Sequence, residues 1–329
     1  MTQRFDMRRI FRTYGMVIVL LFMIILLSLV SRGTFLSPTN IFNVLTQSSI
    51  FGIMALGMTF VIISKGIDLS VGSVLALSGV VAASVAQVAD ATEKYFPNIP
   101  VLPVLVPVVV ALVIGAGCGC ISGFLIAKTG IPAFIATLGM QTVARGFALI
   151  YTKGRPVSNL IPSLSFLGDK VFRNMIPVPV IIYFIMIIIS YILLNKTRFG
   201  KNTYAIGGNI TAAEVSGINV SKNLILIYTY CGLLAGLAAL VFAGRVGSVH
   251  PGAAEGYELT AIAATTIGGT SHSGGIGTIV GAFIGTMVLQ VLRNGFTLLS
   301  VNAYWQKVAE GLIIVVAVII DMRKNAKRD

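Results

Sequence analysis

The stretch "GIDLSVGSVLALSG", residues 66–79, interrupts a chain that is otherwise apolar enough to lie in a lipid bilayer. It places Asp68 between two apolar blocks, where an unpaired charge costs about 3 kcal/mol or more. Lys65 comes just before the stretch and can pair with Asp68. The stretch therefore predicts a break between two membrane helices.

The composition of the whole chain is that of a polytopic membrane protein. Of the 329 residues, 56% are hydrophobic and only 11% are charged, whereas soluble domains carry about a quarter charged residues. The net charge of +13 comes from basic residues in the connections between apolar blocks. This distribution follows membrane topology and does not form one basic face for nucleic acid.

Ten apolar blocks predict about ten membrane segments in an all-α fold. With the N-terminus inside, the inner connections hold about twice as many lysines and arginines as the outer ones, so both termini are expected in the cytoplasm. The eighth block is too short to span as an ordinary helix. The blocks are 14–32, 48–64, 71–90, 101–127, 132–152, 177–195, 224–243, 258–270, 277–298 and 305–321.

A second stretch, "GYELTAIAATTIGG" (256–269), resembles the first at a constant offset of 190 residues (256 − 66). The alignment pairs Asp68 with Glu258 and Ser70 with Thr260. The two copies open segments of opposite predicted direction, which is typical of inverted-topology transporters. We expect a single transmembrane domain, 1–329, with halves of about 1–152 and 153–329 and with broken or re-entrant helices near 65–72 and 256–277.

Two interpretations of the repeated acid remain open. In the first, Asp68 and Ser70 cap the helix that starts near Leu69, and Glu258 and Thr260 do the same in the second copy. In the second, the breaks line a transport pathway or a gate. The two interpretations are compatible, because a capped broken helix can border a pore.

Polar side chains within the apolar blocks are the candidates for a pathway or gate. Each polar group also fits an ordinary hydrogen bond between helices. Arg145 and Arg293 are expected to face protein or water, because lipid exposure would be costly. The candidates are Gln47, Thr59, Asp68, Ser70, Gln141, Tyr257, Glu258 and Asn294.

The sequence shows no catalytic constellation. The nearest fragment to a nucleotide-binding P-loop is "RFGKNT" (198–203), which lacks the first glycine and has Asn202 after the lysine. The three cysteines lie in apolar segments, and the chain has only two histidines. We therefore expect no enzyme, no metal site and no cofactor bound by this chain.

Several segments in combination resemble the membrane permeases of bacterial sugar ABC importers, of the ribose, galactoside, xylose and autoinducer-2 type. The resemblance covers nearly the whole chain. The segments are "GMTFVIISKGIDLSVGSVLALSG" (57–79), "AFIATLGM" (133–140), "NKTRFGKNTYAIGGNITAAEVSGINV" (195–220), "YELTAIAATTIGGTSHSGGIGTIVG" (257–281) and "WQKVAEGLIIVVAV" (305–318).

The resemblance implies a homodimeric pore in the bacterial inner membrane that imports a monosaccharide by alternating access. It also implies a cytoplasmic ATP-binding cassette ATPase that holds ATP and Mg, a periplasmic or lipoprotein sugar-binding protein, and no nucleic acid. A hexose such as galactose is favoured slightly over ribose. Nucleosides or branched-chain amino acids are alternative cargoes, and an ion-coupled secondary transporter is an alternative mechanism.

The loop 195–223 gains a role from the same resemblance. Within it, "GGNITAAEVSGINV" (207–220) predicts a short amphipathic helix with Thr211 as a possible cap. The segment resembles the coupling helix that docks into a groove on the ATPase; a helix lying on the membrane surface is the alternative. The coupling residues expected are Gly208, Asn209, Ala212, Ala213, Glu214, Ser216 and Gly217.

Overall fold

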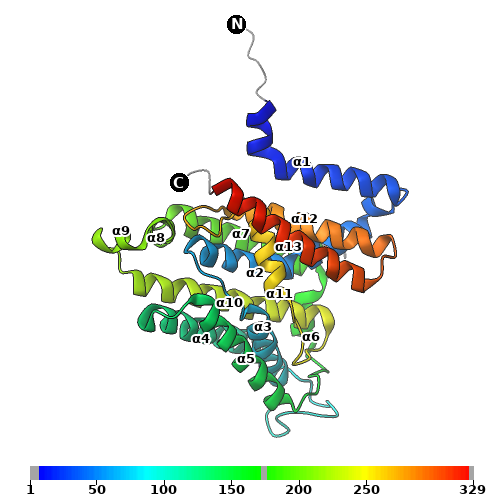
Figure 1. Ribbon diagram of the computed structural model, residues 1–329. Coiled ribbons are helices and arrows are strands. Elements are labelled where there is room, and N and C mark those ends of the chain that lie inside the picture. Colours follow the sequence, from blue (N-terminus) through cyan, green and yellow to red (C-terminus); the bar gives the residue numbers. More distant parts are fainter. Residues whose placement is uncertain (1–6, 172–175, 326–329) are drawn as a thin grey trace.

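The computed structural model describes residues 7–171 and 176–325, and helices make up most of this part of the chain (Figure 1). The long helices are α1 (Met7–Val30), α2 (Pro38–Ile63), α4 (Leu105–Thr129), α5 (Ala133–Thr152), α7 (Val178–Lys196), α10 (Val220–Val246), α12 (Ile279–Leu298) and α13 (Ala303–Asn325). The shorter helices are α3 (Val71–Val85), α6 (Pro162–Ser165), α8 (Arg198–Gly208), α9 (Ile210–Val215) and α11 (Tyr257–Ile267). The remaining elements are the 3-10 turns η1 (Thr34–Leu36) and η2 (Phe166–Gly168) and the antiparallel strands β1 (Lys170–Val171) and β2 (Ile176–Pro177).

The all-α membrane class is confirmed. Among the described helices, α2, α4, α5, α7, α10 and α12 are long and apolar enough to cross a membrane. A helix lies on each of the ten predicted blocks, but α3 and α11 rise only about 22 Å and 16 Å, less than the roughly 30 Å of a bilayer core. The count of ten membrane segments stays a prediction.

Glycines allow α4 and α10 to pack closely along most of their length. A methyl group at Gly115 would lie 2.3 Å from the carbonyl oxygen of Gly232, and one at Gly119 would lie 2.1 Å from that of Tyr228. Only hydrogen fits at these positions. Gly115, Gly119 and Gly123 recur at every fourth position of α4, a spacing that lets membrane helices pack closely, and they form the surface that packs against α10.

Contacts between connections define two ends of the molecule. At one end, which we call the α9 end, Gly275 N donates to the carbonyl oxygen of Ile63 (2.8 Å) and Tyr204 Oη donates to that of Gly277 (2.7 Å). At the far end, Val157 forms a bridge with Val249. In Figure 1, α8 and α9 project at the left, and α6 lies toward the other side.

Two non-helical segments enter the core from these opposite ends. Residues 64–70 leave the α9 end and lead into α3, while residues 247–256 leave the far end and lead into α11. The starts of the two helices meet: a methyl group at Gly72 would lie 2.4 Å from Glu258 Oε2 and 2.4 Å from the carbonyl oxygen of Ala254. The first break falls where the sequence predicts it, and the second begins before residue 256.

In the first copy Ser70 is the N-cap residue of α3, but no side chain makes the predicted capping hydrogen bond to the helix. Asp68 Oδ1 accepts from Ser70 N (2.8 Å) and from Ser70 Oγ (2.6 Å), so the acid fixes the backbone just ahead of α3. α3 begins at Val71, two residues later than predicted. Lys65 is exposed, and its side chain lies against Gly274 instead of Asp68.

In the second copy the predicted side-chain cap is also absent. Gly256, with a φ of +82°, is the N-cap of α11 and has no side chain to offer. Glu258 lies within the first turn and bonds to another helix. Thr260 Oγ1 donates back to the carbonyl oxygen of Gly256 (3.4 Å).

Candidate functional site

One face of α5 makes hydrogen bonds to both non-helical segments. Thr137, Gln141 and Arg145 recur every fourth residue and so share a face of the helix; we call them the α5 stripe. Thr137 Oγ1 donates to the carbonyl oxygen of Ile67 (3.1 Å), and Gln141 Nε2 donates to Glu258 Oε1 (3.2 Å). The stripe therefore joins the segment before α3 to the start of α11.

Arg145, the third residue of the α5 stripe, binds the second non-helical segment, residues 247–256. Its Nη1 donates to the carbonyl oxygens of Pro251 (2.6 Å) and Ala253 (2.8 Å). Non-helical backbone at membrane depth needs such partners, because lipid offers none. The expectation that Arg145 faces protein is confirmed, and its partners are backbone carbonyls.

Glu258 lies where the two helix starts meet. Its side chain is buried, with 6% of the residue exposed. Oε1 is bonded to Gln141, whereas Oε2 has no hydrogen-bond partner among the described residues. The first turns of α3 and α11 both present the positive ends of helix dipoles, which favours a carboxylate here.

Aromatic contacts connect this region to α2. The ring of Tyr257 lies 4.4 Å from the ring of Phe51 (centroid to centroid). The guanidinium carbon of Arg293 lies 4.5 Å from the same Phe51 centroid, within the range of a cation–π interaction.

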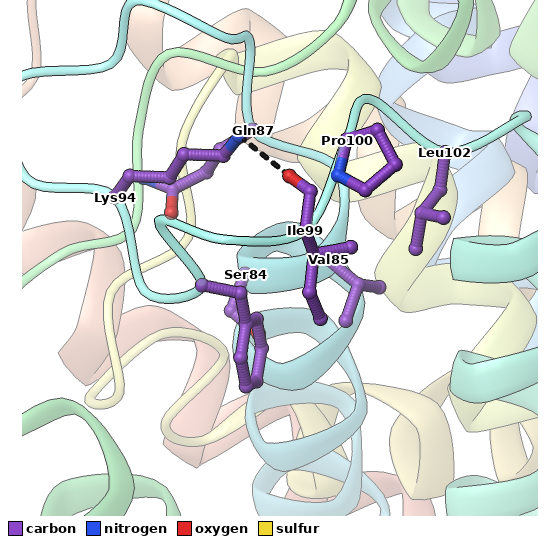
Figure 2. Close-up of a pocket in the computed structure, with 8 residues that line it drawn as sticks. Ser84, Val85, Gln87, Lys94, Ile99, Pro100 and Leu102 are labelled. Atoms are coloured by element: carbon purple, nitrogen blue, oxygen red, sulfur yellow. Dashed lines mark hydrogen bonds between the residues drawn. The ribbon is translucent and has the colours of Figure 1, made fainter.

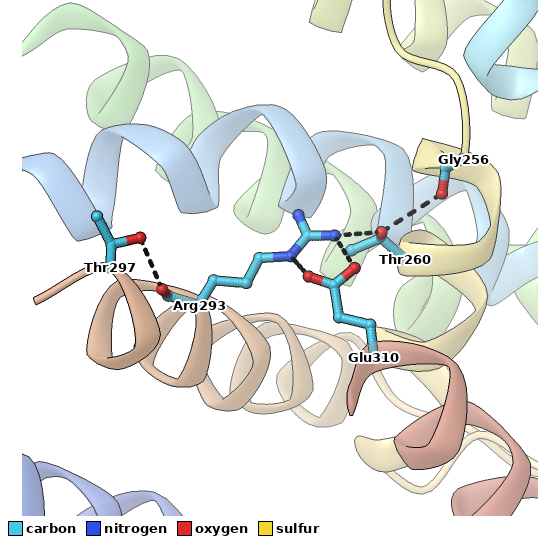
Figure 3. A network of polar contacts seen from close by, with 5 residues as sticks. All are labelled: Gly256, Thr260, Arg293, Thr297 and Glu310. Carbon is cyan, nitrogen blue, oxygen red and sulfur yellow. Dashed lines mark hydrogen bonds and ion pairs between the residues drawn. The ribbon is translucent and has the colours of Figure 1, made fainter. Parts of the chain in front are cut away.

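Arg293 is also the centre of a polar network (Figure 3). Its Nε and Nη2 bond to the two carboxylate oxygens of Glu310, with Nη2 2.8 Å from Oε2. Nη2 also donates to Thr260 Oγ1 (2.8 Å). A bidentate pair of this kind is among the stronger polar contacts in proteins. It joins α11, α12 and α13 on the side facing α2.

Two of the remaining candidates, Thr59 and Asn294, have structural partners. Thr59 Oγ1 donates to the carbonyl oxygen of Ala55 within α2 (2.7 Å). Asn294 exchanges two amide hydrogen bonds with Asn40 (2.9 and 2.8 Å). Gln47 is half-buried on α2.

The structure thus brings together only some of the residues predicted to line a pathway or gate. Gln141, Tyr257 and Glu258 lie together, and Asp68 with Ser70 forms a separate pair beside Cys231 of α10. Sequence reasoning missed Gly72 and Thr137 as members of this region. The four-residue spacing of polar groups on α5 was a sequence signal for Thr137. No sequence signal pointed to Gly72, because the residue aligned with it in the second copy of the repeat is Ile262.

A shallow hollow lies at the far end, beside the end of α3 (Figure 2). Gln87 Nε2 donates to the carbonyl oxygens of Glu93 (3.1 Å) and Ser158 (3.2 Å), and Lys94 Nζ donates to that of Ile99 (2.9 Å). These hydrogen bonds hold the connection between α3 and α4 in place. Across residues 7–171 and 176–325, no group of three or more His, Cys, Asp or Glu is placed to hold a metal ion.

The loop 195–223 contains two helices, α8 and α9, where the sequence predicts one. Asn209 Oδ1 accepts from Ala212 N (3.0 Å), so Asn209 is the cap and the prediction of Thr211 is wrong. Ala213 is buried against Ile206 and Val220, which fixes α9 to the rest of the protein. The other predicted coupling residues, Gly208, Ala212, Glu214, Ser216 and Gly217, are exposed.

Two apolar side chains of α9, Val215 and Ile210, are also exposed, and we call them the apolar tip. Val215 is 86% exposed and Ile210 is 49% exposed. Gly217, with a φ of +82°, ends the helix and turns the chain toward α10. α9 is therefore a projecting segment with a defined shape at one end of the molecule (Figure 1).

Comparisons with known proteins agree over nearly the full length. The chain is 42% identical over 311 residues to the ribose import permease protein RbsC of Escherichia coli K12, covering 93% of each chain. It is 42% identical over 308 residues to RbsC of Bacillus subtilis, covering 93% of this chain and 92% of the relative. It is 38% identical over 330 residues to the galactose/methyl galactoside import permease protein MglC of Escherichia coli K12, covering 98% of each.

No solved structure matches the chain. The family model described as "Branched-chain amino acid transport system / permease component" matches residues 40–318. The match includes both non-helical segments, the α5 stripe and α9. The resemblance to import permeases is therefore confirmed, and the chain belongs to the branched-chain amino acid transport system permease component family.

Proposed function

We propose that this chain is the pore-forming subunit of an ATP-driven importer that moves a monosaccharide across the bacterial inner membrane. The observation that carries the proposal is the near-full-length similarity to ribose and galactose import permeases. The helical, multi-pass architecture agrees with it. ATP hydrolysis is assigned to a separate subunit, and this chain binds no cofactor of its own.

The cargo is a neutral monosaccharide, either ribose or a hexose such as galactose. The sequence alone favoured a hexose, whereas the identity is 42% to the ribose permease and 38% to the galactose permease. The family description names branched-chain amino acids, so these remain the alternative cargo together with nucleosides. A direct uptake assay with each class separates them.

The assembly contains two copies of this chain, a cytoplasmic ATPase and an external sugar-binding protein. The α9 end faces the cytoplasm, and both termini are cytoplasmic. Within one transmembrane domain, the two halves have inverted topology, and each contributes one broken helix to the region around Glu258. Opening and closing of this region alternates access between the two sides of the membrane.

α9 is the coupling segment to the ATPase. Its exposed Val215 and Ile210 supply an apolar contact, and Glu214 supplies a charge that orients the partner. ATP binding on the ATPase acts on α9 and, through Ala213 and the packed residues beneath it, on the start of α10. Coupling of this kind requires that ATP favours one of two arrangements of the membrane part.

Reconstitution into vesicles tests the function. The chain is co-purified with its partner ATPase and binding protein and is assayed for uptake of labelled ribose, galactose, a nucleoside and leucine. We expect uptake of a monosaccharide that requires ATP and the binding protein. Uptake that persists without the ATPase and collapses with a proton or sodium gradient would identify a secondary transporter instead.

A further inference from the structure

The two carboxylate oxygens of Glu258 have different surroundings. Oε1 accepts a hydrogen bond from Gln141 Nε2 (3.2 Å). Oε2 is buried and has no partner among the described residues. A buried oxygen without a donor bears the full cost of its lost hydration. This conformation therefore leaves one strong acceptor unused in the middle of the molecule.

Gly72 covers that unused oxygen. A methyl group at Gly72 would lie 2.4 Å from Oε2 and 2.4 Å from the carbonyl oxygen of Ala254, so the two chain segments are in direct contact. The positive ends of α3 and α11 favour the negative charge of the carboxylate. The backbone N–H groups of Gly256 and Glu258 approach the carboxylate, but none of them forms a hydrogen bond to Oε2. Separation of the two helix starts would uncover an acceptor that is ready for a donor.

The hydrogen bond between Gln141 and Glu258 can be exchanged for other hydrogen bonds. Its bond to Glu258 is 3.2 Å, at the long end of the usual range for N–H···O bonds. Its amide can both donate and accept, and the side chain is only half-buried. A hydroxyl group can therefore replace Gln141 at Oε1 or bind the amide directly, which suits a contact that must form and break during passage.

We propose that Glu258 and Gln141 form a hydrogen-bonding site for the hydroxyl groups of the transported sugar, covered by Gly72 in the closed state. This inference rests on the proposed function. A hydroxyl donates to Oε2, and the same sugar accepts from Gln141 Nε2. The carboxylate disfavours substrates that carry their own carboxylate, which directs the pathway toward neutral polyhydroxy compounds and away from amino acids.

Glu258→Gln tests the site, because it keeps the shape and removes the charge and one acceptor. Glu255→Gln is the matched control: the same change at an exposed acid in the neighbouring segment. In vesicles with the ATPase and the binding protein, we expect Glu258→Gln to lower sugar uptake per ATP hydrolysed about tenfold or more. ATPase activity stimulated by the binding protein should stay within about twofold of the parent protein.

Gln141→Leu provides a second variant, and we expect it to reduce uptake in the same way while ATPase stimulation by the binding protein is retained. Full uptake by Glu258→Gln would overturn the inference. Parallel loss of uptake, ATPase stimulation and Tm would also overturn it, since a structural role alone explains that result. Absence of ATP-dependent uptake in the parent protein would count against the proposed function instead, so the two failures are distinguishable.

Discussion

Gly72, at the start of α3, lies against the buried carboxylate of Glu258 at the start of α11. The two residues belong to segments that enter the core from opposite ends of the molecule. Because only a hydrogen atom fits between them, their contact fixes how closely the two helix starts approach. The proposed closing of the pathway depends on this contact.

We expect Gly72→Ala to prevent this approach. The added methyl group would lie 2.4 Å from Glu258 Oε2 and from a backbone oxygen that cannot rotate away. Overpacking of this kind costs about 1–3 kcal/mol, so Tm should fall together with uptake. Gly117→Ala in α4 is the control, because nothing lies within 4 Å of its added methyl group. Normal uptake by Gly72→Ala would mean that the contact does not limit closure.

Asp68→Ala should mainly lower stability. The carboxylate accepts two hydrogen bonds from Ser70 in a buried position, and their loss costs about 1–3 kcal/mol. Asp68→Asn keeps an acceptor oxygen and should retain much of this stability in thermal unfolding of the purified protein. If Asp68→Ala keeps its Tm and expression but loses transport, Asp68 has a direct role in the pathway.

The Arg293–Glu310 pair is suited to a double-mutant cycle. Both side chains are mostly buried, with 19% and 24% exposed. Removal of one partner leaves a poorly hydrated charge, and we expect Arg293→Met or Glu310→Met alone to cost about 3 kcal/mol in stability. The double variant should lose less than the sum of the single variants. Additive losses would show that the two residues are not coupled.

Stability should also depend on the protonation of His272, which lies in the connection 268–278, outside the membrane-spanning helices. Burial lowers the pKa of His272 below its usual 6.5, and the charge of Asp321 only partly opposes this shift. The unfolded chain then binds the proton more readily. The stability contributed by neutral His272 is complete above about pH 6.5 and is lost as the pH falls toward the folded-state pKa.

Thermal unfolding from about pH 8 to about pH 5 measures this effect. The parent protein should lose stability toward the acid end, and His272→Gln should lose less. His250→Gln is the control, because His250 is exposed at the far end. Identical pH profiles for the parent protein and His272→Gln would contradict the prediction.

Glu214→Arg should weaken binding of the ATPase, because it reverses a charge on the exposed face of α9. We expect about a tenfold loss of affinity, and a similar loss for Val215→Asp at the apolar tip. Quantitative co-purification measures both. Asp90→Arg makes the same charge change at the far end and should leave binding intact. Unchanged co-purification of both α9 variants would remove α9 as the coupling segment.

The sequence predicted those features that depend on local pattern. Apolar block length placed the helices, and the interruption around Asp68 marked the start of α3. The asparagine cap of α9 was missed, because Asn209 and Thr211 are both acceptable caps and only the backbone geometry decides between them. α8 was missed because its segment "RFGKNTYAIGG" contains three glycines, and glycine disfavours helices.

Contacts between distant residues were beyond sequence reasoning. The Asn40–Asn294 amide pair joins residues 254 positions apart, and either side chain alone fits many partners. Glu258 was predicted from its alignment with Asp68, but its partner is Gln141 in another helix. The repeat therefore identified the right region, while the chemistry at its two copies differs because Asp68 precedes its helix and Glu258 lies within one.

Structures of the complete complex in nucleotide-free and ATP-bound states would show whether the contact between Gly72 and Glu258 opens during transport. The quantity to measure is the separation of Gly72 Cα from the carboxylate of Glu258. We predict that the two are in contact in one state and separate in the other, with Glu258 Oε2 then open to the pathway. Contact that persists in every state of a complex that actively transports sugar would show that Gly72 and Glu258 do not form a gate.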